Sequence, residues 1–155
     1  MINATVPSFD GESILTLGGR SAHHSKQYEP RPHTTRCLVV DDDRLILKYV
    51  VHMLSILGLQ EVEAAQRFPE VMRKLLVGPY GLLITDLEMP DMNGFRLVQT
   101  IKEDARDMKT VIMTGRPKDD CFEMMAERRV DGWLFKPFDL EDMRSMLSEV
   151  GILNA

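Results

Sequence analysis

Residues 81–94 read GLLITDLEMPDMNG, an apolar run that ends in a carboxylate and is followed at once by turn-forming residues. An unbroken short run of this kind is typical of a strand that is buried on both faces, as strands of parallel sheets are. The proline, asparagine and glycine after Asp86 favour a turn. The pattern therefore predicts a buried strand at 81–86 that delivers the Asp86 side chain to the end of a sheet.

Similar apolar runs recur along the chain and alternate with stretches of helical periodicity. We expect strands at 37–40, 61–65, 81–86, 110–115 and 132–136, and helices at 44–58, 69–78, 95–104, 119–129 and 139–151. Five strands that alternate with five helices predict an α/β fold, in which a parallel sheet is covered by helices on both faces.

The composition places the chain among ordinary globular proteins. Its 155 residues are 44% hydrophobic and 28% charged, with a net charge of -5. This charge gives no general support for binding nucleic acid, and no apolar run has membrane-spanning length. No secretory signal opens the sequence. We therefore expect a cytoplasmic protein that neither inserts in a membrane nor binds nucleic acid directly, with Cys37 and Cys121 as reduced, partly buried residues.

The chain divides near Arg36. Residues 1–36 carry four basic and three acidic side chains, and residues 37–155 carry 15 basic and 21 acidic ones. The apolar residues of the first segment show no sustained helical or strand periodicity. We therefore expect a flexible N-terminal extension at 1–36 and a single domain at 37–155. An apolar patch at 14–17 could dock on the domain or on a partner. The His23-His24 pair has no third ligand nearby and makes a poor metal site.

Polar side chains follow several of the predicted strands. Asp41, Asp42 and Asp43 follow the first strand, Asp86 ends the third, Thr114 ends the fourth, and Lys136 follows the fifth. Ligands of open parallel sheets bind at the carboxyl ends of the strands, so these groups should converge. Clustered carboxylates repel one another unless a cation joins them, and oxygen ligands suit Mg²⁺, with Mn²⁺ as a substitute. The set predicts phosphoryl transfer to a carboxylate.

Four motifs in this order resemble the receiver domain of bacterial two-component response regulators, the stand-alone chemotaxis type. They are LVVDDD, LLITDLEMPDMNG, VIMTG and LFKPF, and the resemblance covers about residues 36–151. It implies a flavodoxin-like fold with the strand order 2-1-3-4-5.

The resemblance also implies roles for individual residues. Asp86 is the phosphoacceptor, while Asp41 and Asp42 hold Mg²⁺ together with Asp86 and the backbone carbonyl of Glu88. Lys136 pairs with the phosphoryl group.

A second set of residues matches the switch of the family. Thr114 is the switch hydroxyl, Trp133 is the switch aromatic, and Gly115 leaves room for the phosphoryl group. The peptide bond between Lys136 and Pro137 is expected to be cis.

By the same resemblance, the phosphodonor is a histidine kinase or a histidine phosphotransfer protein. The downstream target binds the face formed by helix 119–129, strand 132–136 and helix 139–151. The chain is expected to be a monomer or weak homodimer, and no enzyme beyond its own phosphorylation and slow dephosphorylation.

Two other readings stay open. Asp41-x-Asp43 after an apolar strand also fits a phosphatase of the haloacid dehalogenase type, which would leave TDLEMPDMNG unexplained. A receiver-like module that only binds partners is the third class. Structural roles are also available to single residues: Asp43 can cap the first helix, and Glu88 can pair with Arg116 at the rim.

Overall fold

A computed structural model of the chain describes residues 35–154. The predicted extension therefore lies outside the described residues, except for Thr35 and Arg36. The apolar patch at 14–17 and the histidines at 23 and 24 lie outside them as well.

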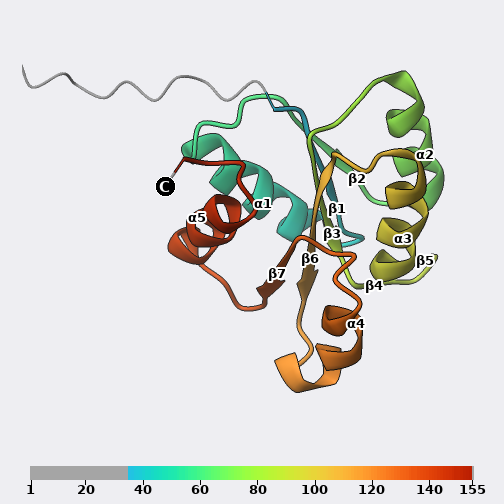
Figure 1. Cartoon of the computed structure of the whole chain (residues 1–155). Helices are drawn as coiled ribbons and strands as arrows, with labels where there is room; N and C mark the ends of the chain where they lie inside the picture. Colours follow the sequence, from blue (N-terminus) through green and yellow to red (C-terminus); the bar gives the residue numbers. More distant parts are fainter. Residues whose placement is uncertain (1–34, 155) are drawn as a thin grey trace, which may run out of the picture.

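Five parallel strands form the central sheet (Figure 1). The strands are β1 Cys37–Val40, β2 Val62–Ala65, β3 Leu82–Asp86, β6 Lys109–Thr114 and β7 Gly132–Phe135. Their spatial order is β2-β1-β3-β6-β7. Counted along the chain, these are strands 2-1-3-4-5, so the predicted flavodoxin-like α/β fold is confirmed.

Helices cover both faces of this sheet (Figure 1). On one face lie α1 Arg44–Ile56 and α5 Leu140–Glu149, and on the other lie α2 Phe68–Val77, α3 Gly94–Asp104 and α4 Phe122–Ala126. Within residues 35–154, none of the helices combines the length with the apolar composition that a transmembrane helix requires.

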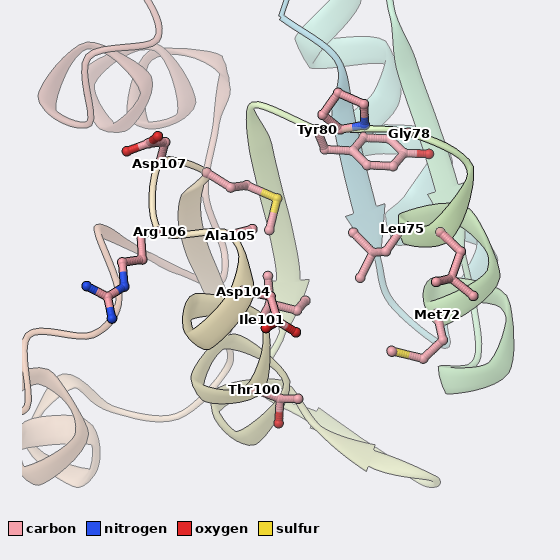
Figure 2. A pocket seen from close by; sticks show the side chains of 13 residues that line it. Met72, Leu75, Gly78, Tyr80, Thr100, Ile101, Asp104, Ala105, Arg106 and Asp107 are labelled. Carbon is pink, nitrogen blue, oxygen red and sulfur yellow. The ribbon is translucent and has the colours of Figure 1, made fainter.

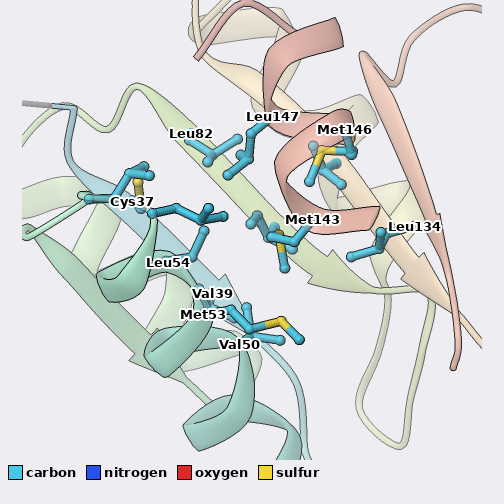
Figure 3. Close-up of a cluster of buried hydrophobic side chains, with 14 of the residues drawn as sticks. Cys37, Val39, Val50, Met53, Leu54, Leu82, Leu134, Met143, Met146 and Leu147 are labelled. Carbon is cyan, nitrogen blue, oxygen red and sulfur yellow. The ribbon is translucent and has the colours of Figure 1, made fainter. Parts of the chain in front are cut away.

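Alternate residues of each strand pack into two separate cores. Cys37 and Val39 of β1 face α1 and α5, whereas Leu38 and Val40 face α2 and α3. Figure 3 shows the first core, where α5 residues such as Met143 meet α1 and the sheet. Burial of each such side chain stabilises the fold by about 1.5–3 kcal/mol before entropy is counted. The two cores hold the strand ends in one rigid edge, which supports the polar groups there.

Two local features differ from the sequence-based expectation. The helix predicted at 119–129 is instead a 3-10 turn, Lys118–Cys121, followed by the short α4. Only a few side chains of this stretch pack against the sheet, so a continuous apolar stripe is missing. Arg128, at φ 53, then turns the chain out of helical geometry. A small antiparallel hairpin, β4 Glu88–Met89 with β5 Met92–Asn93, was not predicted.

Candidate phosphoacceptor site

Strand register places the acidic residues together. Val40 of β1 is paired with Thr85 of β3, so the next residues, Asp41 and Asp86, are neighbours at the sheet edge. Both are buried, whereas Asp42 is exposed. One carboxylate oxygen from each of Asp41, Asp42 and Asp86 lies within 4.8 Å of the other two. The predicted acidic cluster is therefore present.

Lys136 reaches this cluster from the end of β7, the edge strand that is separated from β3 by β6. Phe135 of β7 is paired with Thr114 of β6, and Lys136 follows directly. Its Nζ donates to Asp86 Oδ1 at 2.8 Å and to Asp41 Oδ2 at 3.1 Å. The Lys136-Pro137 peptide bond is cis, as predicted. One ammonium thus bridges two buried carboxylates.

Burial and charge oppose each other in this group. Burial raises the pKa of Asp41, while the backbone N–H of Asp43 and the Lys136 ammonium lower it in part; the net direction is upward. Burial lowers the pKa of Lys136, but its hydrogen bond to Asp86 and the negative charge of Asp41 outweigh this, so the pKa is raised. The lysine therefore stays charged, and the site holds an excess of negative charge that a cation would offset.

Thr114 and the rim residues lie at the end of β6. Thr114 is buried, and its Oγ1 accepts a hydrogen bond from the Arg116 backbone N–H at 3.0 Å. Above it, the Arg116 guanidinium forms an ion pair with the Glu88 carboxylate. This pair lowers the pKa of Glu88 and raises that of Arg116. The predicted contact between opposite charges at the rim is confirmed.

Glu88 also meets the site through its backbone, since its N–H donates to Asp86 Oδ2 at 3.2 Å. Asp86 therefore accepts one hydrogen bond on each oxygen, from Lys136 and from this amide. Both bonds orient the carboxylate toward the open edge of the sheet.

Gly94 is a positioning residue that the sequence reasoning missed. A Cβ added there would lie 2.0 Å from the carbonyl oxygen of Asp86, which leaves room for no side chain. The Gly94 N–H donates to the Leu87 carbonyl at 2.8 Å, and Asn93 caps α3 beside it. The Asn-Gly pair at 93–94 is the signal that could have pointed to this close approach.

The switch residues are placed on β6 and β7. Trp133 is half-buried and packs against the core on the α2–α3 face, with its ring stacked on Phe135 at 6.3 Å between centroids. Gly115 is exposed, and a Cβ there would meet nothing within 4 Å. Space for a phosphoryl group beside Thr114 is therefore not limited by residue 115.

Asp43 has a structural role. Its carboxylate accepts hydrogen bonds from the backbone N–H groups of Leu45 and Ile46, and so caps α1. A phosphatase of the Asp41-x-Asp43 type needs this second carboxylate as a free acid near the reacting group. Here the carboxylate is turned to the helix, which gives that alternative no support.

The donor set fits a hard divalent cation. Asp41, Asp42 and Asp86 supply carboxylate oxygens, with no nitrogen or sulfur ligand in the cluster. Mg²⁺ prefers oxygen ligands of this kind and binds through one or two carboxylates while keeping several waters. The exposed Asp42 is consistent with a site open to water.

The doubly wound fold and its acidic, lysine-bridged edge define a receiver-type module. The family model of the response regulator receiver domain matches residues 37–148, and the chain belongs to this family.

Individual relatives agree with this assignment. The chain is 34% identical over 110 residues to the DNA-binding transcriptional regulator NtrC of Azospirillum brasilense, which covers 71% of this chain and 23% of the relative. The chain thus spans less than a quarter of that relative's length.

Solved structures match at similar identity. Chemotaxis response regulator CheY4 of Vibrio cholerae superposes with a TM-score of 0.68 at 28% identity, over 75% of this chain and 98% of that one. Response regulator protein TrrA of Thermotoga maritima does so with a TM-score of 0.66 at 25% identity, over 75% and 98%.

Proposed function

We propose that this chain is a phosphoaccepting receiver, in which Asp86 takes a phosphoryl group from a phosphodonor protein in a Mg²⁺-dependent reaction. The observation that carries the proposal is the bridge from Lys136 Nζ to Asp86 Oδ1 and Asp41 Oδ2. It places a fixed cation beside a carboxylate that is buried except at the sheet edge.

In the proposed transfer, a carboxylate oxygen of Asp86 attacks the phosphorus of a phosphohistidine. The P–N bond breaks as the P–O bond forms, and the leaving group is the imidazole of the donor protein's histidine. Lys136 holds the acceptor carboxylate and meets the phosphoryl oxygens, whose charge it offsets. The buried hydroxyl of Thr114, at the end of the neighbouring strand β6, would donate to the same oxygens.

Asp41 and Asp42, with Asp86 and the Glu88 carbonyl, would hold Mg²⁺. When bound, Mg²⁺ supplies positive charge against the phosphoryl oxygens. The solved structure of TrrA is a complex with Mg(2+)-BeF, which supports the proposal that this chain also binds Mg²⁺.

Signalling would follow from the movement of Thr114. A hydroxyl drawn to the phosphoryl group vacates space beside β7, and Trp133 can move into it, which would change the face formed by α4, β7 and α5. Phe122 on this face is 73% exposed, and Met124 and Met125 are half-buried, which suits a partner surface. The donor would be a histidine kinase or phosphotransfer protein, and the target a second protein.

A phosphorylation assay tests the proposal. Acetyl phosphate with Mg²⁺ should add one phosphoryl group to the intact protein, as measured by mass spectrometry. The Asp86→Asn variant should take up none, and chelation of the metal by EDTA should abolish uptake by wild type. Equal labelling of wild type and variant would refute the proposed acceptor.

We further propose that the chain does not turn over external substrates. Asp43, which a phosphatase of the Asp41-x-Asp43 type would use as its general acid, is held instead as the cap of α1. Small phosphoesters such as p-nitrophenyl phosphate should therefore be hydrolysed at the rate of the buffer. Sustained turnover that Asp41→Asn abolishes would favour the phosphatase reading.

A further inference from the structure

A groove lies between α2 and α3, at the end of the sheet opposite the acidic site. Its volume is about 470 Å³. Figure 2 shows Met72 and Leu75 of α2 on one side of the groove and Ile101 of α3 on the other, with Tyr80 at one end. The wall is therefore mainly apolar.

The rim of the groove exposes further aliphatic surface. Leu76, which lines the groove, is 85% exposed, and the adjacent Val77 is 78% exposed. These two neighbouring aliphatic side chains extend the apolar surface of the groove toward solvent, where a second apolar segment could cover it.

The described part of the chain begins beside this groove. The Thr35 methyl group lies 2.6 Å from the position that a Cβ of Gly81 would take, and Arg36 Nη1 lies 2.7 Å from that of Gly78. The Arg36 guanidinium also stacks on the Tyr80 ring at 4.5 Å from the centroid. Since Gly78 and Tyr80 line the groove, the described part of the chain begins near its edge.

The sequence before Thr35 contains a segment that matches the groove in chemistry. Residues 14–17 read ILTL, with three aliphatic side chains, and 17 residues separate Leu17 from Thr35. A chain of that length spans up to about 60 Å when extended, and about 23 Å on average as a random coil. Tethering at this range gives an effective concentration near the millimolar level, so a weak apolar contact suffices.

Charge also favours this occupant. Residues 18–34 contain three basic side chains, Arg20, Lys26 and Arg31, and one acidic side chain, Glu29. The exposed carboxylates of Asp104 and Asp107 line the outer edge of the groove, beside Arg106. If residues 14–17 dock in the groove, the linker of net positive charge lies near an edge of net negative charge, and the two attract each other.

We propose that Ile14, Leu15 and Leu17 occupy the α2–α3 groove of their own chain. The tether, which starts at the groove's edge, favours this segment over a second copy at moderate protein concentration. This contact does not require phosphorylation of Asp86.

Paramagnetic broadening in the full chain tests the contact. A nitroxide is attached through Thr16→Cys; Cys37 and Cys121 are buried, and burial raises the pKa of both thiols, to about 12 for Cys37. The label should erase the amide signals of Leu76, Ile101 and Asp104. The signals of Met143 and Met146, on the opposite face, should persist and serve as internal reference.

Two matched variants separate docking from random approach of the tail. Ile14→Ser, Leu15→Ser and Leu17→Ser together, with the same label, should restore the groove signals, as should Leu76→Lys on the exposed rim. Groove signals that remain unbroadened in the labelled parent, or that stay erased in the triple variant, would overturn the proposal. A mixture of labelled and isotope-enriched chains should show no broadening, and broadening in that mixture would assign the groove to a second copy instead.

Discussion

Lys136 Nζ donates to Asp86 Oδ1 at 2.8 Å, although the two residues are 50 positions apart in sequence. The contact exists because β3 and β7 both end at the same edge of the sheet, on either side of β6. The same ammonium holds Asp41, so it offsets charge on two carboxylates at once. Lys136 therefore contributes to the stability of the folded protein and, in the proposed function, to phosphoryl transfer.

Removal of the ammonium should destabilise the metal-free protein. In Lys136→Met, Asp41 and Asp86 lose their shared donor and are left buried beside each other, which we expect to cost about 1–3 kcal/mol. Urea unfolding in EDTA measures this cost. Mg²⁺ should recover part of it by binding the folded state, and a variant as stable as wild type in EDTA would contradict the bridge. Lys48→Met, at an exposed position of α1, is the control.

Gly94→Ala should disturb the acceptor without touching its side chain. The added methyl group would collide with the Asp86 carbonyl oxygen, and we expect a loss of about 1–3 kcal/mol in the free energy of unfolding. The rate of labelling by acetyl phosphate should fall as well. For stability, Gly115→Ala is the matched control, since its methyl group meets nothing within 4 Å and should change the free energy by no more than about 0.5 kcal/mol. Equal stability of the two variants would show that the close approach is unimportant.

The sheet and its polar edge could be predicted because their signals are local in sequence. Apolar runs such as 37–40 and 81–86 predict buried strands. The parallel order of the strands then places Asp41, Asp86 and Lys136 at one edge of the sheet. The 3-10 turn before α4 could not be predicted, because it depends on how the segment packs against distant residues. The Gly94 contact has a local signal in the Asn-Gly pair at 93–94, but that signal does not say which atom lies close to the glycine. The positive φ of Arg128 and the short distance between Gly94 and the Asp86 carbonyl oxygen arise only in the folded chain.

Trp133 should report the state of the site. It is the only tryptophan in the chain, so emission arises from one half-buried ring, three residues before Lys136. We expect its intensity or wavelength to change when Mg²⁺ is added, and again with beryllofluoride. Asp86→Asn should lose the second change. Fluorescence that responds to neither addition would show that the aromatic residue is not coupled to the site.

The Glu88–Arg116 pair should slow loss of the phosphoryl group. Both residues stand at the rim, two positions after Asp86 and Thr114, where they can limit the approach of water to the phosphorus. Arg116→Ala should therefore shorten the lifetime of the phosphorylated protein, measured by decay of the intact mass. Exchange of the two charges, Glu88→Arg with Arg116→Glu, should restore part of it. Decay of the single variant at the wild-type rate would exclude the gate.

We expect Asp86 alone to accept the phosphoryl group, and mapping of the modified residue by mass spectrometry checks this. Protein phosphorylated by acetyl phosphate and Mg²⁺ is reduced with borohydride, which converts an acyl phosphate of aspartate to homoserine, and the peptides are sequenced by mass spectrometry. We predict homoserine at position 86 and unmodified aspartate at positions 41, 42 and 43. Homoserine at position 41, with position 86 unmodified, would contradict the receiver mechanism and place the acceptor after the end of β1 instead.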